Sequence, residues 1–119
     1  MENLDPPPFV QYNGHIEIRE TRQFRTWLDG LRDRAARVRI DDRLKRLANG
    51  NAGDAKAVGG GVMELRFHFG SGYRVYYIWQ VGILVILLTG GDKSSQLRDI
   101  ANAKQLAKEA ENGIENLPI

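Results

Sequence analysis

The feature that most constrains the fold of this 119-residue chain is an uninterrupted apolar run, ILVILLT, at residues 83–89. A strand that faces water on one side alternates apolar and polar side chains, whereas this run is aliphatic at both odd and even positions. It is far shorter than the roughly 18–20 residues of a membrane-spanning helix. The run therefore predicts a central strand that is buried on both faces of a sheet.

Three further strands are predicted before the central one. Residues 62–69 alternate between apolar and polar side chains, and residues 73–80 are separated from them by a GSG turn that suits a hairpin. An earlier strand is expected around Ile16 and Ile18, after a turn at Asn13-Gly14. Side chains two residues apart share a face of a strand. On the face of residues 62–69 that points away from the apolar core we expect Glu64, Arg66 and His68.

Apolar residues at helical spacing predict three helices. We expect the first to begin at Thr21 and a break at Gly30 and Asp33 to separate it from the second. The second should end at the asparagines and glycines of residues 49–53, and the third should run from Ser94 or Ser95 to about Glu111. The glycine-rich stretch at residues 53–61 is interpreted as a flexible connector, since it contains no phosphate-loop motif. The predicted order is β-α-α-β-β-β-α. It describes an α+β domain with helices packed on one face of a small, largely antiparallel sheet.

Length and composition predict one domain at residues 14–119, preceded by a flexible, proline-containing leader at residues 1–13. The chain has no cysteine, and its two histidines, His15 and His68, lie far apart, so we expect no metal and no cofactor. Acids and prolines occupy the start, where a signal peptide is basic and then apolar. We therefore expect a cytoplasmic protein with no membrane partner. Residues 19–93 carry fourteen Lys or Arg against eight Asp or Glu, which suggests a polyanionic partner.

Cations at three points of the predicted sheet indicate a phosphate site. The hairpin places Arg74 beside Arg66, and Lys93 follows the central strand at the entry to a helix, where unsatisfied backbone N–H groups attract anions. Guanidinium groups this close repel one another unless an anion lies between them, and phosphate suits their geometry. The alternative is that each cation pairs with a nearby acid on a solvated face. As residues of a sheet face, these arginines are expected to contribute little to the core.

A second basic feature is the row of Arg39, Arg43 and Arg46, which lie four and three residues apart on one face of the second helix. Such a row is suited either to contact with a polyanion or to solvent alone. On the sheet face, His68 is interpreted as a possible participant in the chemistry of the phosphate site.

The segments ELRFHFGSGYRVYY, ILLTGGDKSSQ and DIANAKQLAKE resemble the RelE/ParE superfamily of toxins from bacterial toxin–antitoxin modules. The branch most similar to the chain is that of the addiction-module killer proteins, related to HigB-type toxins, over about residues 16–111. The resemblance implies a RelE-like sheet whose concave face enters the ribosome and cleaves messenger RNA without a metal. It also implies a helix-turn-helix antitoxin as partner, with operator DNA bound only through the pair. With messenger RNA as the implied substrate, the contacts to RNA or the ribosome are expected from Arg39, Arg43, Arg46, Glu64 and Tyr76.

Laid on this sequence, the resemblance implies catalytic roles for Arg66, Arg74 and Lys93, with His68 beside them. A lysine that the family often uses on the second strand is replaced by Glu64, and a tyrosine used by some members on the last helix has no match. The base is therefore open between His68 and Glu64, and the acid between Lys93 and His68. ParE-type relatives inhibit DNA gyrase by binding alone, so a gyrase poison is the alternative function.

Overall fold

A computed structural model describes residues 9–10, 15–80 and 84–112 of the chain. Its elements are β1 (Phe9–Val10), β2 (Glu17–Glu20), α1 (Arg22–Asp29), α2 (Arg34–Ala48), β3 (Ala55–Gly59), β4 (Val62–Arg66), β5 (Arg74–Gln80), β6 (Leu84–Gly91) and α3 (Gln96–Asn112). A short 3₁₀ turn at Lys93–Ser95 leads into α3. Across these described ranges, no helix is both long enough and apolar enough to cross a membrane.

The strands form one mixed sheet in the order β1-β2-β6-β5-β4-β3. Neighbouring strands are antiparallel except β2 and β6, which are parallel. Every residue of β6 is buried, which confirms the prediction of a central strand covered on both faces. The α+β class and the largely antiparallel sheet are likewise confirmed.

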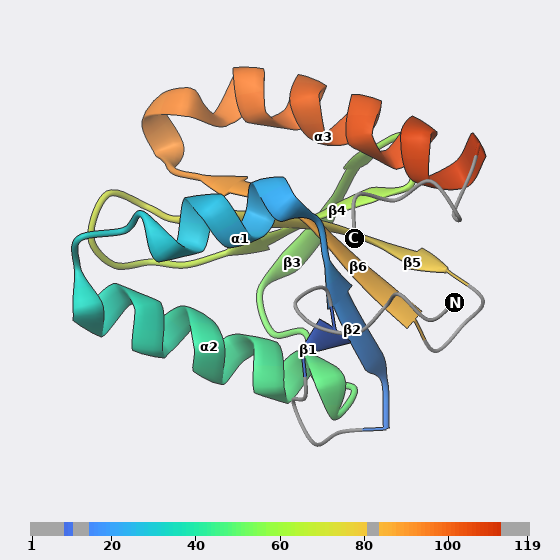
Figure 1. Ribbon diagram of the computed structural model, residues 1–119. Helices are drawn as coiled ribbons and strands as arrows, with labels where there is room; N and C mark the ends of the chain where they lie inside the picture. Colours follow the sequence, from blue (N-terminus) through green and yellow to red (C-terminus); the bar gives the residue numbers. More distant parts are fainter. Residues whose placement is uncertain (1–8, 11–14, 81–83, 113–119) are drawn as a thin grey trace.

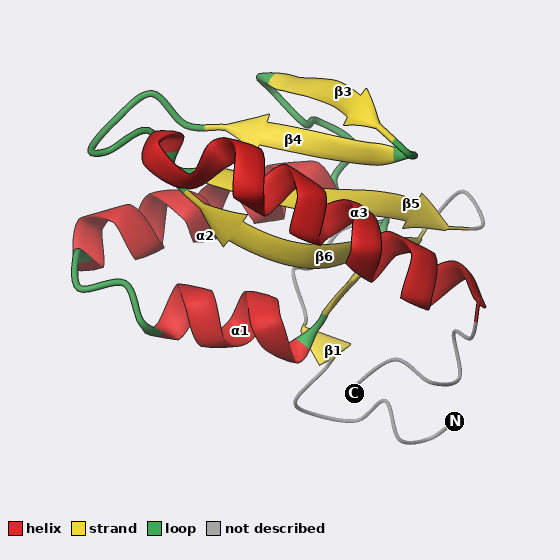
Figure 2. Ribbon diagram, turned by 90° about the horizontal axis from the view of Figure 1, so that it is seen from above, coloured by secondary structure: helices red, strands yellow, loops and turns green. Residues whose placement is uncertain are grey.

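The expectation that all helices pack on one face of the sheet is wrong. Figures 1 and 2 show three layers, with α1 and α2 on one side of the sheet and α3 on the other. Two separate apolar clusters fill the spaces between the layers. One joins α1 and α2 to residues such as Val75 and Tyr77, and the other joins α3 to Tyr76 and Ile78.

The reason lies in the alternation along β5 and β6. Odd and even residues of these strands point to opposite faces, and both sets are apolar and buried. One helical layer can cover only one face, so a second layer is needed to remove the other face from water. α3 supplies it with a stripe of small and medium apolar residues, Ala103, Leu106, Ala107 and Ala110.

The stretch interpreted as a flexible connector contains a strand. β3 pairs antiparallel with β4, and the three glycines 59–61 form the turn between them, each with a φ between +63° and +101°. Only glycine adopts such angles readily. Because the exposed edge strand reads AKAVG, it carries no apolar alternation to reveal it.

Helix boundaries agree closely with the sequence prediction at three of four points. The Thr21 side chain accepts a hydrogen bond from the Phe24 N–H at the start of α1, and Asp33 caps α2. α2 ends before Gly50, whose φ is +92°. At the last helix, however, Asp92 caps the 3₁₀ turn ahead of the predicted Ser94 or Ser95, because its carboxylate reaches the Ser94 N–H at 2.9 Å.

Part of the predicted leader is a strand. Phe9 and Val10 pair with β2 opposite Arg19 and Ile18. The remaining leader, residues 1–8 and 11–13, lies outside the described residues, as does the predicted turn at Asn13-Gly14.

Candidate functional site

Strand register brings three of the predicted site cations to one end of the sheet. Arg66 and Arg74 are directly opposite partners on β4 and β5, so both leave the sheet on the same face. The Lys93 N–H donates to the Ser71 carbonyl at 3.3 Å, which ties the segment before α3 to the hairpin turn. Between them lies Gly72, where an added Cβ would be 3.3 Å from the Lys93 Cβ and 3.6 Å from Arg74 Nη1. A glycine here therefore allows the two cationic side chains to approach closely.

Arg74 is buried, which contradicts the expectation that it contributes little to the core. Its side chain is 9% exposed, and its Nε lies 3.8 Å from Oε2 of the fully buried Glu64. Nη1 donates to the carbonyls of Gly72 and Tyr73 at 3.0 and 3.2 Å, so the guanidinium holds the hairpin turn. Nε itself is buried without a hydrogen-bond partner.

Glu64 lies at the centre of a buried polar network beneath the start of α3. Its Oε2 accepts hydrogen bonds from the Tyr76 hydroxyl at 3.0 Å and from Gln96 Nε2 at 2.7 Å. Burial raises the pKa of the Tyr76 phenol, and the hydrogen bond to Glu64 raises it further. Both Glu64 and Tyr76 are 0% exposed. The expectation that they contact RNA directly is therefore wrong for this conformation, since α3 covers them.

Arg66 and His68 share one carboxylate, that of Asp54. Arg66 donates to Asp54 Oδ1 through Nε at 3.2 Å and Nη2 at 2.9 Å, and His68 Nε2 is hydrogen bonded to Asp54 Oδ2. The hydrogen bond from His68, and then that from Arg66, hold the pKa of the Asp54 carboxyl below its ordinary value. The side chain of His68 is 71% exposed and that of Arg66 32%. Both remain accessible to a ligand, unlike Arg74.

The arginine row of α2 divides into an anchor and two exposed members. Arg43 donates to the carbonyls of Arg66 at 2.9 Å and Ala52 at 3.0 Å, and its guanidinium lies 4.6 Å from the ring centre of Phe67. Burial lowers its pKa. Arg39 and Arg46 are exposed. Thus Arg43 serves the fold, while the other two keep their charge at the surface.

The arginine row of α2 and His68 meet at a hollow of about 230 Å³ between α2 and the residues that follow β4. Its lining comprises Arg39, Asp42, Arg43, Arg46, Phe67, His68 and Phe69. The Arg39 guanidinium stands 4.7 Å from the ring centre of Phe69. The exposed histidine and the arginine row, far apart in the sequence, therefore face one hollow that carries a surplus of positive charge.

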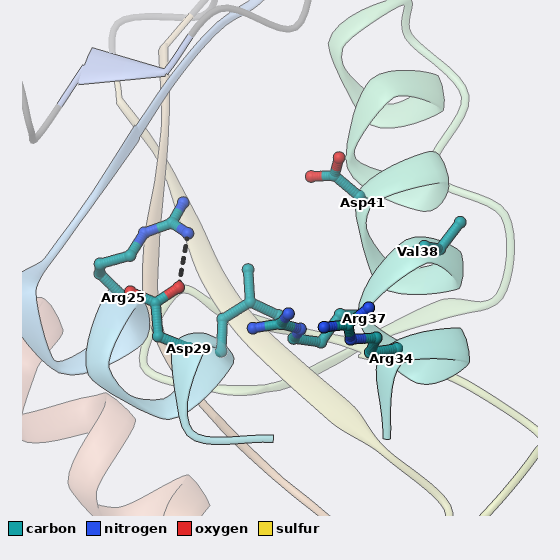
Figure 3. A pocket seen from close by; sticks show the side chains of 7 residues that line it. Arg25, Asp29, Arg34, Arg37, Val38 and Asp41 are labelled. Carbon is teal, nitrogen blue, oxygen red and sulfur yellow. Dashed lines mark hydrogen bonds and ion pairs between the residues drawn. The ribbon is translucent and has the colours of Figure 1, made fainter. Parts of the chain in front are cut away.

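A larger hollow of about 330 Å³ between α1 and α2 contains none of the predicted site residues (Figure 3). Arg25 there is engaged by acids, with Nη1 donating to Asp29 at 3.1 Å and Nε to Glu20 at 2.6 Å. These carboxylates raise the pKa of Arg25. Arg34 and Arg37 lie across from them on α2. We therefore place the candidate site at the strand ends.

Sequence reasoning missed Asp54 and Gln96. Asp54 lies just before an edge strand that was interpreted as a connector, and Gln96 and Asp99 lie on the first turns of α3, which was expected on the other face of the sheet. Asp99 packs against Gly91, where a Cβ would lie 1.8 Å from Oδ2, and accepts a hydrogen bond from the Ser95 hydroxyl. The double-sided burial of β6 was the signal that could have placed α3 over this face.

Comparisons with known proteins connect the chain to one family. The family model described as "Phage derived protein Gp49-like (DUF891)" matches residues 26–111, which include every residue of the candidate site. An uncharacterized protein of Haemophilus influenzae is 52% identical over 94 residues, covering 79% of this chain and 95% of that relative. No solved structure matches the chain at a significant level.

Proposed function

Because the chain belongs to the Gp49-like family of phage-derived proteins, we propose that it is the toxin of a toxin–antitoxin module and cleaves messenger RNA on the ribosome. The family is one of RelE/Gp49-type, toxin-like proteins associated with such modules. Cleavage of RNA and action on the ribosome are the finer part of the proposal, and they rest on the site described above.

The observation that carries the proposal is the gathering of Arg66, Arg74 and Lys93 around the hairpin turn. Lys93 and Arg66 are its accessible members, while Arg74 holds the turn between them. A site of this kind suits a group with several anionic oxygens, since each cation can approach a different oxygen. An RNA phosphate is such a group, and the surplus of Arg and Lys over residues 19–93 favours a polyanion that carries many of them.

Together with a base, these residues would promote cleavage by the RNA's own 2′-hydroxyl. The 2′-oxygen forms a bond to phosphorus as a base takes its proton, and the bond from phosphorus to the 5′-oxygen breaks as an acid protonates the leaving oxygen. Arg66 and Lys93 stabilise the extra charge on the pentacoordinate phosphate. No water and no metal take part in these bond changes.

Of the two groups considered for the base, His68 fits and Glu64 does not. His68 is 71% exposed, whereas Glu64 is fully buried and its Oε2 already accepts two hydrogen bonds. A base must come within hydrogen-bond reach of the proton that it removes. We assign His68 as the base and Lys93, which is exposed beside the turn, as the acid for the leaving oxygen.

A toxin of this kind requires a partner that restrains it in its own cell. We propose a small helix-turn-helix antitoxin, and operator DNA that is bound by the pair through the antitoxin. Co-purification from the native operon at low salt tests this proposal. Recovery of the chain without a second small protein would contradict it.

The function is tested with purified ribosomes and a defined messenger RNA. Lys93→Gln and Arg66→Gln should each lower cleavage by about 10²–10³-fold, as the loss of one donor to a developing oxyanion does. Lys108→Gln is the matched control, because it removes the same charge from an exposed position on α3. Thermal melts on the same samples separate lost chemistry from lost folding.

Two results would refute the proposal. Full cleavage by both folded variants would exclude the phosphate clamp. If the unmutated chain leaves RNA intact on active ribosomes and inhibits DNA gyrase instead, the protein is a binding poison without nuclease activity.

A further inference from the structure

Asp54 occupies an unusual position for a half-buried acid, because each of its carboxylate oxygens bonds a different partner. Oδ1 accepts two hydrogen bonds from Arg66, and Oδ2 is bonded to His68 Nε2. An ionised carboxylate only accepts hydrogen bonds, so Nε2 carries a proton in this arrangement. Among the described residues, His68 Nδ1 has no hydrogen-bond partner. Nδ1 is therefore the nitrogen left to take up or release a proton.

The backbone around Asp54 is itself fixed from two sides. The Arg66 N–H donates to the Asp54 carbonyl at 2.9 Å, and Arg43 Nη2 donates to the same carbonyl at 3.3 Å. Gly53 precedes it with a φ of +70°, and an added Cβ there would be 3.2 Å from Arg43 Nη2. The chain thus passes tightly around a guanidinium of α2, which sets the direction in which the Asp54 side chain leaves the backbone.

We propose that Asp54 is a positioning residue of the cleavage reaction, which holds His68 in one ring orientation and Arg66 at a fixed place beside it. The inference rests on the proposed function and deepens it. A base must be directed at the 2′-hydroxyl, and a charge-stabilising arginine must be directed at the neighbouring phosphate oxygen. Because one carboxylate binds both side chains, it fixes the distance between the base, His68, and the charge-stabilising arginine, Arg66.

The proton follows a simple route in this arrangement. Nδ1 of the neutral His68 ring takes the 2′-hydroxyl proton as the 2′-oxygen attacks phosphorus, and Nε2–H stays with the Asp54 carboxylate. The ring then carries a positive charge, which the carboxylate stabilises without itself becoming protonated. An amide at position 54 would keep the shape but remove that charge.

The first measurement does not depend on RNA. The Asp54 carboxyl is titrated by carbon-13 NMR in the full chain, and its pKa should lie below the ordinary value of about 3.9. His68→Gln should move that pKa upward, because the hydrogen bond from His68 is the largest cause of its lowering. Glu109→Gln, an exposed change on α3, should leave it where it was. A carboxyl that titrates identically with and without His68 would overturn the inference.

The second measurement is cleavage on ribosomes by Asp54→Asn, His68→Gln and the double variant. We expect Asp54→Asn to lower kcat by about 10²-fold with little change in KM, less than the roughly 10⁴-fold loss in a buried Ser-His-Asp triad, because His68 is exposed. In the His68→Gln background, Asp54→Asn should add only the part of its effect that acts through Arg66, well below the loss in the single variant, since groups that act as one unit are not additive. Glu109→Gln should cleave normally.

The two measurements distinguish the possible failures. Full cleavage by a folded Asp54→Asn would overturn the positioning role even if the carboxyl titration shows the contact with His68. Independent, multiplicative losses in the double variant would also overturn it. If the unmutated chain does not cleave RNA, the proposed function fails and the role falls with it, while the titration shows separately whether Asp54 and His68 are joined.

Discussion

Removal of the Arg74 charge should destabilise the fold strongly, because Arg74 faces the fully buried Glu64. Arg74→Met keeps most of the apolar stem and deletes the guanidinium. Loss of one partner of a buried ion pair typically costs about 3–5 kcal/mol. Here the two groups are 3.8 Å apart, and Glu64 keeps hydrogen bonds from Tyr76 and Gln96. We therefore expect the lower end, about 3 kcal/mol of the free energy of unfolding. At about 4 °C per kcal/mol for a domain of this size, the Tm should fall by about 12 °C.

The assay is urea unfolding followed by circular dichroism, with Glu64→Gln and the double variant completing a cycle. Once the carboxylate is an amide, Arg74→Met should cost only about 1 kcal/mol, since no charge is left buried. A cost below 1 kcal/mol in the unmutated background, or an equal cost in both backgrounds, would refute the reasoning. The result also decides how cleavage by Arg74 variants is to be interpreted, because a partly unfolded sample loses activity for a trivial reason.

Three other changes have defined outcomes. Tyr76→Phe should lower the free energy of unfolding by about 1–2 kcal/mol through the loss of a buried hydrogen bond. Because the Tyr76 pKa is raised on folding, the stabilisation by the protonated phenol should be present below about pH 10 and lost as the pH rises above it. Urea titrations of both proteins at pH 8–11 measure the two effects. Gly90→Ala would put a Cβ 2.3 Å from the Trp27 ring, so we expect a loss of about 1–3 kcal/mol and a changed tryptophan emission, and an unaltered spectrum would contradict this packing. We expect replacement of both Arg39 and Arg46 by glutamine, with Arg43 unchanged, to weaken the salt dependence of binding to single-stranded RNA. The slope of log K against log salt should become smaller by about 1.4. An unchanged slope would mean that these two arginines only face solvent.

Much of the fold could be predicted from local sequence patterns. The run at 83–89 predicted a strand buried on both faces, and Thr21 and Asp33 marked helix boundaries that the structure confirms. Local patterns could not predict on which side of the sheet α3 packs, because this depends on which apolar face of the sheet α1 and α2 leave uncovered. β3 could not be recognised either, since an exposed edge strand is held by backbone hydrogen bonds and needs no apolar side chains.

The sequence could predict the part of the site that lies on the β4–β5 hairpin, because a short turn sets the register of these two strands. The GSG hairpin sets Arg66 opposite Arg74, and both ends of that pairing lie within a few residues of the turn. The partners of these arginines were not predictable in the same way. Asp54 reaches Arg66 only through the pairing of β3, and Gln96 reaches Glu64 only because α3 folds back across the sheet. The roles of Arg66, Arg74, Lys93 and His68 in catalysis stay predictions until cleavage is measured.

The parallel pairing of β2 with β6 has a consequence for how the chain is made. β2 precedes all the helices of the described residues, and β6 is the last of their strands. The hydrogen bond from the Thr21 hydroxyl to the Leu88 carbonyl therefore joins residues 67 positions apart. During synthesis, β2 and α1 have no central strand to pack against until residue 91 has left the ribosomal tunnel. Folding that depends on such distant contacts is slow, since the loop must close before the contacts form. A nascent chain should therefore lack the pairing of β2 with β6, and the contact of Thr21 with Leu88, until the whole of β6 has emerged from the tunnel.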